Sequence, residues 1–177
     1  VARFVEAARR IRRGDPLDPE TRIGPMARVR ARFDVHDQVR RSVAMGARVL
    51  LGGEIPEGPG AYYPPTVLVD VTPDMPVCAE ETFGPVAAIM AAKDAEDAVR
   101  IANDSDFGLA AALWTADIEA ADRLARRIET GAVFVNGMSA SDPRVPIGGV
   151  KHSGYGRELS HFGLREFCNT QLRWVRP

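Results

Sequence analysis

The chain has 177 residues and a mass of 19.2 kDa, which is the size of one domain or two small ones. Apolar residues make up 45% of it and charged residues 27%, so the composition excludes wholesale disorder. The net charge of −1 argues against a nucleic-acid-binding domain, and no apolar run approaches the roughly 20 residues that cross a bilayer.

The charges are spread unevenly along the chain. Residues 1–50 carry a net charge of +6, residues 51–122 a net charge of −12, and residues 123–177 a net charge of +5. An acidic middle between two basic ends predicts that the middle packs beside the ends, in this chain or in a neighbouring copy. The alternative is that the three segments form separate solvated surfaces.

Hydrophobic periodicity predicts two helices and two strands in the first half of the chain. The helices are expected over residues 1–13 and 26–46, with Val29, Phe33, Val39 and Val43 facing inward on the second. Strands are expected over residues 47–53 and 66–71, separated by a loop rich in proline and glycine.

The second half alternates between strands and helices. Strands are expected over residues 86–92, 109–115 and 132–136, and helices that begin after Asp94 and Asp117 lie between them. This alternation is typical of a parallel α/β sheet. A 20-residue loop over 137–156 follows, and loops of that length are usually functional. A helix over 157–167 and a strand over 169–175 complete the expected elements.

Cysteine and histidine residues give no sign of a metal site. Cys78 and Cys168 match neither a zinc pattern nor a redox motif, and His36, His152 and His161 are scattered through the chain. Two isolated cysteines are most simply free and reduced. The first 13 residues carry five arginines and no apolar core, so a secretory signal is not expected and the expected location is cytoplasmic.

Three motifs carry a resemblance to a known family. They are GDPLDPETRIGPM at 14–26, EETFGPV at 80–86 and PIGGVKHSGYGRE at 146–158. In this order and at these spacings they resemble the C-terminal part of aldehyde dehydrogenases, and residues 135–169 are most similar to bacterial succinate-semialdehyde dehydrogenases. The resemblance covers residues 1–177. It implies a parallel-sheet α/β catalytic domain that is incomplete, a C-terminal fragment with an oligomerisation tail at about 168–177.

The resemblance also implies a chemistry. Family members oxidise an aldehyde, here expected to be succinate semialdehyde, to a carboxylate through a cysteine thioester, with NAD or NADP as cofactor. The nucleophile, the general base and the oxyanion residues would lie upstream, so the chain holds no catalytic residue and is expected to be inactive alone. Neither cysteine matches the nucleophile segment, and both are expected to be small buried side chains.

Partners follow from the same resemblance. They are the small-molecule aldehyde, a missing N-terminal cofactor domain and further copies of the chain in a dimer or tetramer, with neither nucleic acid nor membrane among them. The alternative from a different class is a non-catalytic interaction or assembly module that retains the fold.

The resemblance assigns site residues at two places. Glu81 matches the glutamate that accepts hydrogen bonds from the hydroxyls of the nicotinamide ribose, and Phe83 matches the aromatic side chain beside that ribose. On the residues alone, this segment is also compatible with a solvated turn. Ser141 and Ile147 stand where other members carry aromatic pocket residues. Ser141 suits a substrate with a carboxylate, to which Arg144 could add charge, the alternative being a solvated loop arginine.

Overall fold

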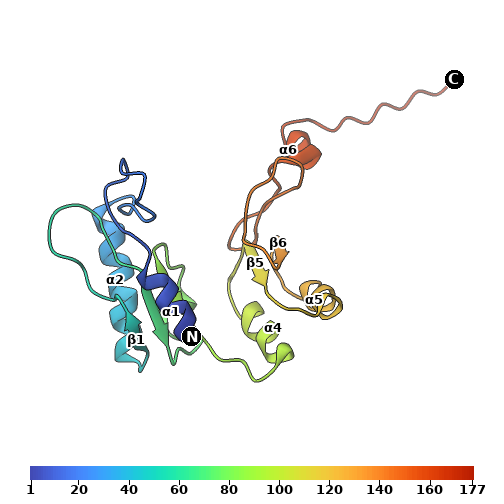
Figure 1. Cartoon of the computed structure of the whole chain (residues 1–177). Coiled ribbons are helices and arrows are strands. Elements are labelled where there is room, and N and C mark those ends of the chain that lie inside the picture. Colours follow the sequence, from blue (N-terminus) through green and yellow to red (C-terminus); the bar gives the residue numbers. More distant parts are fainter. The chain divides into compact units, whose positions relative to one another are not determined.

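The computed structural model describes residues 1–177 and divides into two compact units, Val1–Ala92 and Lys93–Pro177 (Figure 1). Each unit has its own helices and its own strand pairs. None of the helices is both long enough and apolar enough to cross a membrane. The expected α/β class with parallel strands is confirmed, although antiparallel strand pairs occur beside the parallel ones.

The first unit is built on a three-stranded sheet. In chain order its elements are α1 (Ala2–Arg9), α2 (Val29–Ala44), β1 (Arg48–Leu51), β2 (Thr66–Val69), α3 (Pro76–Ala79) and β3 (Val86–Ala88). The strand order is β1-β2-β3, in which β1 is antiparallel and β3 parallel to β2. All four residues of the central strand are buried, which explains why its sequence is a continuous rather than an alternating apolar run.

Both faces of this sheet are covered by helices. Successive side chains of a strand point to opposite faces, and Val67 and Leu68 of β2 follow this rule. Val67 packs in a cluster with Val5 and Ala8 of α1, whereas Leu68 packs in a cluster with Val39 of α2. The two helices therefore lie on opposite faces of β2.

Helix α2 is shorter than the sequence predicts and turns a different stripe inward. Val39 is buried as expected, but Val29, Phe33 and Val43 are 46%, 50% and 43% exposed, and Val35, at 2%, faces inward instead. The stripe that faces the sheet comprises Val35, Val39 and Ser42, which recur at helical spacing. The helix ends before Gly46, whose φ of +115° suits glycine and terminates a helix.

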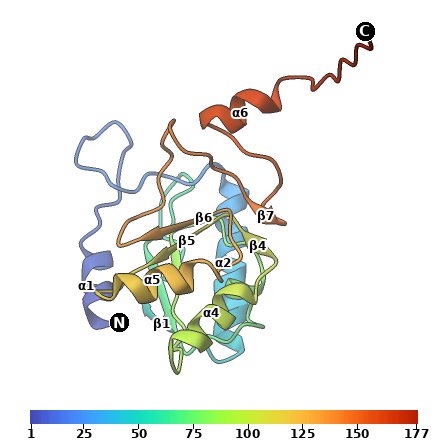
Figure 2. The same cartoon turned by 90° about the vertical axis from the view of Figure 1, so that its right-hand side faces the viewer.

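The second unit contains two separate strand pairs. Its elements are α4 (Ala95–Asn103), β4 (Phe107–Gly108), β5 (Ala110–Leu113), α5 (Ile118–Ala125), β6 (Ala132–Val135), β7 (Val150–Lys151) and α6 (Ser160–Glu166). Strands β5 and β6 are parallel and α5 connects them, whereas β4 and β7 are antiparallel (Figure 2). Asp94 and Asp117 cap α4 and α5 as predicted, each accepting a backbone hydrogen bond of 2.8 Å.

Two expectations for the strands are wrong. Residues 86–136 were expected to share one parallel sheet, but β3 pairs with β2 of the first unit and β5 pairs with β6. Residues 169–175 form no strand, and residues 164–177 are all exposed. A strand needs a partner for its backbone groups, and this chain places none beside that segment. Trp114 and Trp174 are 66% and 76% exposed, so neither is in the core of this chain.

The uneven charges pair as predicted within each unit. Arg41 of the basic first segment binds Glu80 of the acidic middle at 2.8 Å. In the second unit, Arg127 of the basic last segment binds Glu96 of the acidic middle. Arg48 and Asp70 form a third such pair at 3.1 Å.

Candidate functional site

Helix α3 is held against α2 by a buried serine. The Val77 backbone N–H, in the first turn of α3, donates to Ser42 Oγ at 3.1 Å, and the Ser42 hydroxyl donates to the Gln38 carbonyl at 2.8 Å. The residue before α3, Met75, provides no side-chain cap. Ser42 therefore satisfies a backbone donor that a helix start leaves unpaired.

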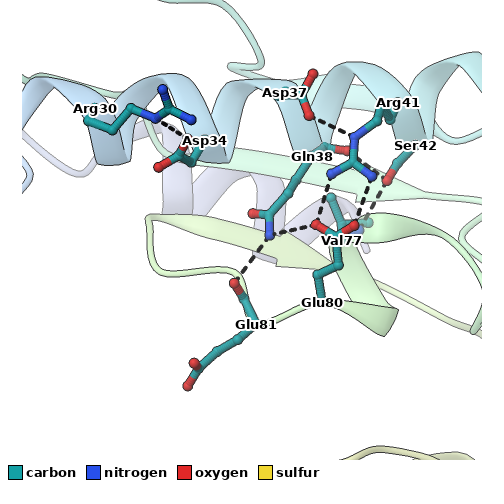
Figure 3. A network of polar contacts seen from close by, with 9 residues as sticks. All are labelled: Arg30, Asp34, Asp37, Gln38, Arg41, Ser42, Val77, Glu80 and Glu81. Atoms are coloured by element: carbon teal, nitrogen blue, oxygen red, sulfur yellow. Dashed lines mark hydrogen bonds and ion pairs between the residues drawn. The ribbon is translucent and has the colours of Figure 1, made fainter.

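The residue after α3, Glu80, is anchored to α2 by three hydrogen bonds (Figure 3). Arg41 donates to both carboxylate oxygens at 2.8 Å, and Gln38 Nε2 donates to one of them at 3.2 Å. Gln38 Nε2 also donates to the backbone carbonyl of Glu81 at 3.2 Å. The bond from Arg41 lowers the pKa of Glu80 below its usual value, so the pair is charged at neutral pH.

The side chain of Glu81, unlike that of Glu80, is not anchored to α2. Its side chain is exposed and points away from the network around Glu80 (Figure 3). The carboxylate forms neither an ion pair nor a hydrogen bond with this chain. As expected for an extended segment, Glu80 and Glu81 thus face opposite sides, and both oxygens of Glu81 are free to accept.

Phe83 lies beside an open cavity of about 820 Å³. The ring is 74% exposed, and the lining also includes Gly84, Pro85, residues 22–28 and Ala31. The first two sequence motifs, which are far apart in the chain, therefore meet around one cavity. The close approach of Gly84 to α2 maintains this arrangement, since a Cβ there would lie 3.0 Å from a methyl carbon of Val35.

The 137–156 loop places its three predicted substrate residues in two groups. Ser141 and Arg144 lie on an exposed part of the loop, where Arg144 Nε binds Asp142 Oδ1 at 2.9 Å. That bond lowers the pKa of Asp142, and the charge of Arg144 is balanced inside the loop. Ser141 is exposed, with no hydrogen bond from its hydroxyl to this chain.

Ile147 lies apart from that pair. It exchanges two backbone hydrogen bonds with Glu158, of 3.0 and 2.7 Å, and lines a second cavity of about 570 Å³ together with residues of α6. Ser141 and Arg144 do not line this cavity. The structure therefore places Ile147 at this cavity, but neither Ser141 nor Arg144.

Comparison with known proteins decides the family. The model of the aldehyde dehydrogenase family matches residues 1–173. The chain belongs to the aldehyde dehydrogenase family. The resemblance predicted from the sequence motifs is thereby confirmed.

The most similar relatives show how much of such an enzyme this chain represents. It is 59% identical over 172 residues to the succinate semialdehyde dehydrogenase [NAD(P)+] of Escherichia coli K12, covering 97% of this chain and 37% of that protein. It is 54% identical to an aldehyde dehydrogenase of Paenarthrobacter nicotinovorans, covering 92% of this chain and 35% of that protein. The chain thus spans little more than a third of the length of these relatives.

A solved structure agrees in fold and coverage. The succinic semialdehyde dehydrogenase of Streptococcus pyogenes, in complex with NADP+, superposes with a TM-score of 0.93 at 38% sequence identity. The match covers 99% of this chain and 40% of that one.

The two cysteines of this aldehyde dehydrogenase chain differ from each other. Cys78 is half-buried in α3, and burial raises the pKa of its thiol. Cys168 is exposed, so the expectation that it is buried is wrong; it follows the end of α6, where the chain has no further packing partner. A raised pKa keeps Cys78 protonated, which does not favour a nucleophilic thiolate.

Sequence reasoning missed Gln38 and Arg41 as neighbours of the site. Their signal in the sequence is weak, because both are polar residues on a helix whose partners lie about 40 positions later. The spacing of these polar residues is the one signal that could have pointed to their role. Residues 38, 41 and 42 fall on one face of a helix, and the sequence leaves open what that face meets.

Proposed function

We propose that this chain provides the C-terminal part of the catalytic domain of an NAD(P)-dependent aldehyde dehydrogenase that oxidises succinate semialdehyde to its carboxylate. The observation that carries the proposal is the free carboxylate of Glu81, two residues before Phe83, whose ring lines an open cavity. The substrate is supported by relatives named as succinate semialdehyde dehydrogenases at 59% and 47% identity.

The residues present fit NAD or NADP as the cofactor. The two free oxygens of Glu81 can accept hydrogen bonds from two vicinal ribose hydroxyls, which a paired carboxylate could not do. The exposed ring of Phe83 offers a flat apolar surface at the edge of the cavity. When bound, the nicotinamide supplies the hydride acceptor. The role of Glu81 and Phe83 is to hold and orient it.

Substrate recognition would fall to the 137–156 loop. The free hydroxyl of Ser141 can donate to the distal carboxylate of succinate semialdehyde, and Ile147 supplies an apolar wall. Arg144 is already paired with Asp142, so it contributes charge only where the substrate carboxylate displaces that partner. Ser141 is therefore the first of the three to test.

The remaining parts of the reaction would come from an upstream region. The cysteine that forms the thioester, the base that activates water and the amide that holds the oxyanion are assigned there. The chain alone is then inactive, because proximity and orientation of these groups cannot be replaced by free reagents. The strand at 132–135 and the exposed tail at about 168–177 are the proposed contacts between copies in a homo-oligomer.

The test compares this chain with the complete enzyme, meaning this chain preceded by the upstream region. Both are incubated with NAD+ or NADP+ and either succinate semialdehyde or butanal, an uncharged aldehyde of equal length. We expect reduced nicotinamide only from the complete enzyme, and faster with succinate semialdehyde. Turnover by the chain alone would contradict the proposal.

Glu81→Gln tests the assigned carboxylate. Hydrogen bonds to a charged acceptor contribute about 1.5–3 kcal/mol, of which the amide keeps only a part. We expect weaker coenzyme binding and slower hydride transfer, so aldehyde deuterated at C1 should show a larger isotope effect than in the parent. Glu57→Gln, at an exposed loop residue, is the matched control. Unchanged coenzyme binding and isotope effect in Glu81→Gln would rule out the role.

A further inference from the structure

We infer that Gln38 and Arg41 of α2 are positioning residues that fix the orientation of Glu81 through its backbone and through Glu80. The inference rests on the proposed function, since it concerns how the coenzyme-binding carboxylate is held in place. It adds two residues from a different helix, about 40 positions upstream of the motif that contains Glu81.

The segment that carries Glu81 has little regular structure of its own. Helix α3 ends at Ala79 and β3 begins at Val86, and Glu80 is already extended, with φ of −103° and ψ of 156°. The Glu81 N–H forms no backbone hydrogen bond, so neither a helix nor a sheet ladder fixes this peptide. External contacts must set its orientation.

Gln38 provides one of those contacts directly. The residue is only 8% exposed, and its amide nitrogen donates to the Glu81 carbonyl and to the Glu80 carboxylate, both at 3.2 Å. A primary amide has two N–H groups, and these two bonds use both. Gln38 therefore ties the backbone of Glu81 and the side chain of Glu80 to a single buried group.

Arg41 provides the second contact. Its guanidinium meets the Glu80 carboxylate with two parallel bonds of 2.8 Å, while its Nε binds Asp37 at 2.7 Å. A bidentate pair fixes orientation as well as distance, which a single bond does not. With Glu80 fixed on one side of the extended chain, the next side chain, Glu81, is directed to the other side (Figure 3).

The attachment of α3 to α2 does not rest on these contacts alone. Helix α3 is attached to α2 separately, by the bond from Val77 to Ser42 and by the core cluster that contains Val39, Met75 and Val77. Loss of Arg41 should consequently leave α3 in place and loosen only the peptide after it. Hydride transfer is sensitive to small errors of position, so that loosening should appear in coenzyme kinetics.

The experiment uses the complete enzyme with Arg41→Met, Arg41→Lys and Gln38→Leu. Arg30→Met is the matched control, because Arg30 has an ion pair with Asp34 at 2.8 Å on the same helix but no contact with residues 80–81. We expect Arg41→Met and Gln38→Leu to raise the coenzyme KM by about three- to tenfold and to increase the isotope effect with deuterated aldehyde. Both quantities for Arg41→Lys should lie between those of the parent and of Arg41→Met, and those for Arg30→Met should match the parent.

A double variant separates this inference from the proposed function. If Arg41 acts through Glu81, adding Arg41→Met to Glu81→Gln should change the coenzyme KM little further. Two results would overturn the positioning role and leave the proposed function intact. One is that the two substitutions raise the coenzyme KM independently, so that their effects multiply. The other is that Arg41→Met has the same coenzyme KM as Arg30→Met. If Glu81→Gln itself is silent, the coenzyme-binding role of Glu81 fails, and the positioning role fails with it. The proposed function fails only if the complete enzyme does not reduce the coenzyme with succinate semialdehyde.

Discussion

Ser42→Ala tests the buried hydrogen bond between α2 and α3. The serine is fully buried, and its hydroxyl oxygen is the partner of the Val77 N–H at 3.1 Å. Alanine removes one atom and leaves the rest of the packing unchanged. It leaves the Val77 N–H buried without an acceptor, since this residue is 7% exposed.

The size of the effect follows from two opposing contributions. An unsatisfied buried donor costs about 1–3 kcal/mol. Alanine is a better helix former than serine, which returns up to about 0.5 kcal/mol. We therefore expect Ser42→Ala to lower the free energy of unfolding by about 0.5–3 kcal/mol, as set by these two contributions.

Equilibrium urea unfolding measures this loss. The midpoint should fall while the slope stays constant, because the surface exposed on unfolding does not change. Ser139→Ala removes the same hydroxyl from an exposed residue without a hydrogen bond to this chain, and should be nearly neutral. A Ser42→Ala midpoint equal to that of Ser139→Ala would refute the argument that this hydroxyl satisfies a buried donor.

Two further predictions concern the second unit and the pH dependence. Gly131→Ala should destabilise the protein by about 1–3 kcal/mol or more, because its Cβ would overlap the Gly148 carbonyl, whereas Gly137→Ala, with its nearest atom at 3.9 Å, should be neutral in thermal unfolding. Glu80→Gln should lower the melting temperature at neutral pH, and the difference from the parent should shrink as the pH falls below about 4.5. The reason is that Arg41 lowers the pKa of Glu80 in the folded protein. The stabilisation is therefore present above the ordinary pKa of a glutamate and is lost as the pH falls through the lowered pKa of the folded protein. A difference that persists unchanged in acid would contradict the ionic origin.

Local signals in the sequence predicted much of the fold. The capping aspartates Asp94 and Asp117 marked two helix starts correctly, because a cap depends on residues three positions away. The β-branched run at 66–69 and the apolar run at 132–135 also proved to be strands. The motif segments identified the family, which neither periodicity nor composition could have done.

Long-range pairing could not be predicted from the same signals. The local sequence of β3 does not show whether this strand pairs with β2 or with β5. Strand pairing depends on the register between apolar faces that lie far apart in the chain. For the same reason the sequence motif assigns no role to Glu80. Its anchoring to Arg41 depends on how α2 packs on the sheet, and a list of residues does not contain that information.

The buried central strand has a consequence for the chain before it folds. Thr66–Val69 is an uncharged, β-prone run, and such runs invite pairing between chains when they are exposed. Pro64 and Pro65 precede it without a backbone donor, and Asp70 follows it with a charge. Residues of these kinds at the borders of an apolar strand act as gatekeepers against aggregation. The segment on which the first unit is built thus carries its own protection during synthesis and refolding.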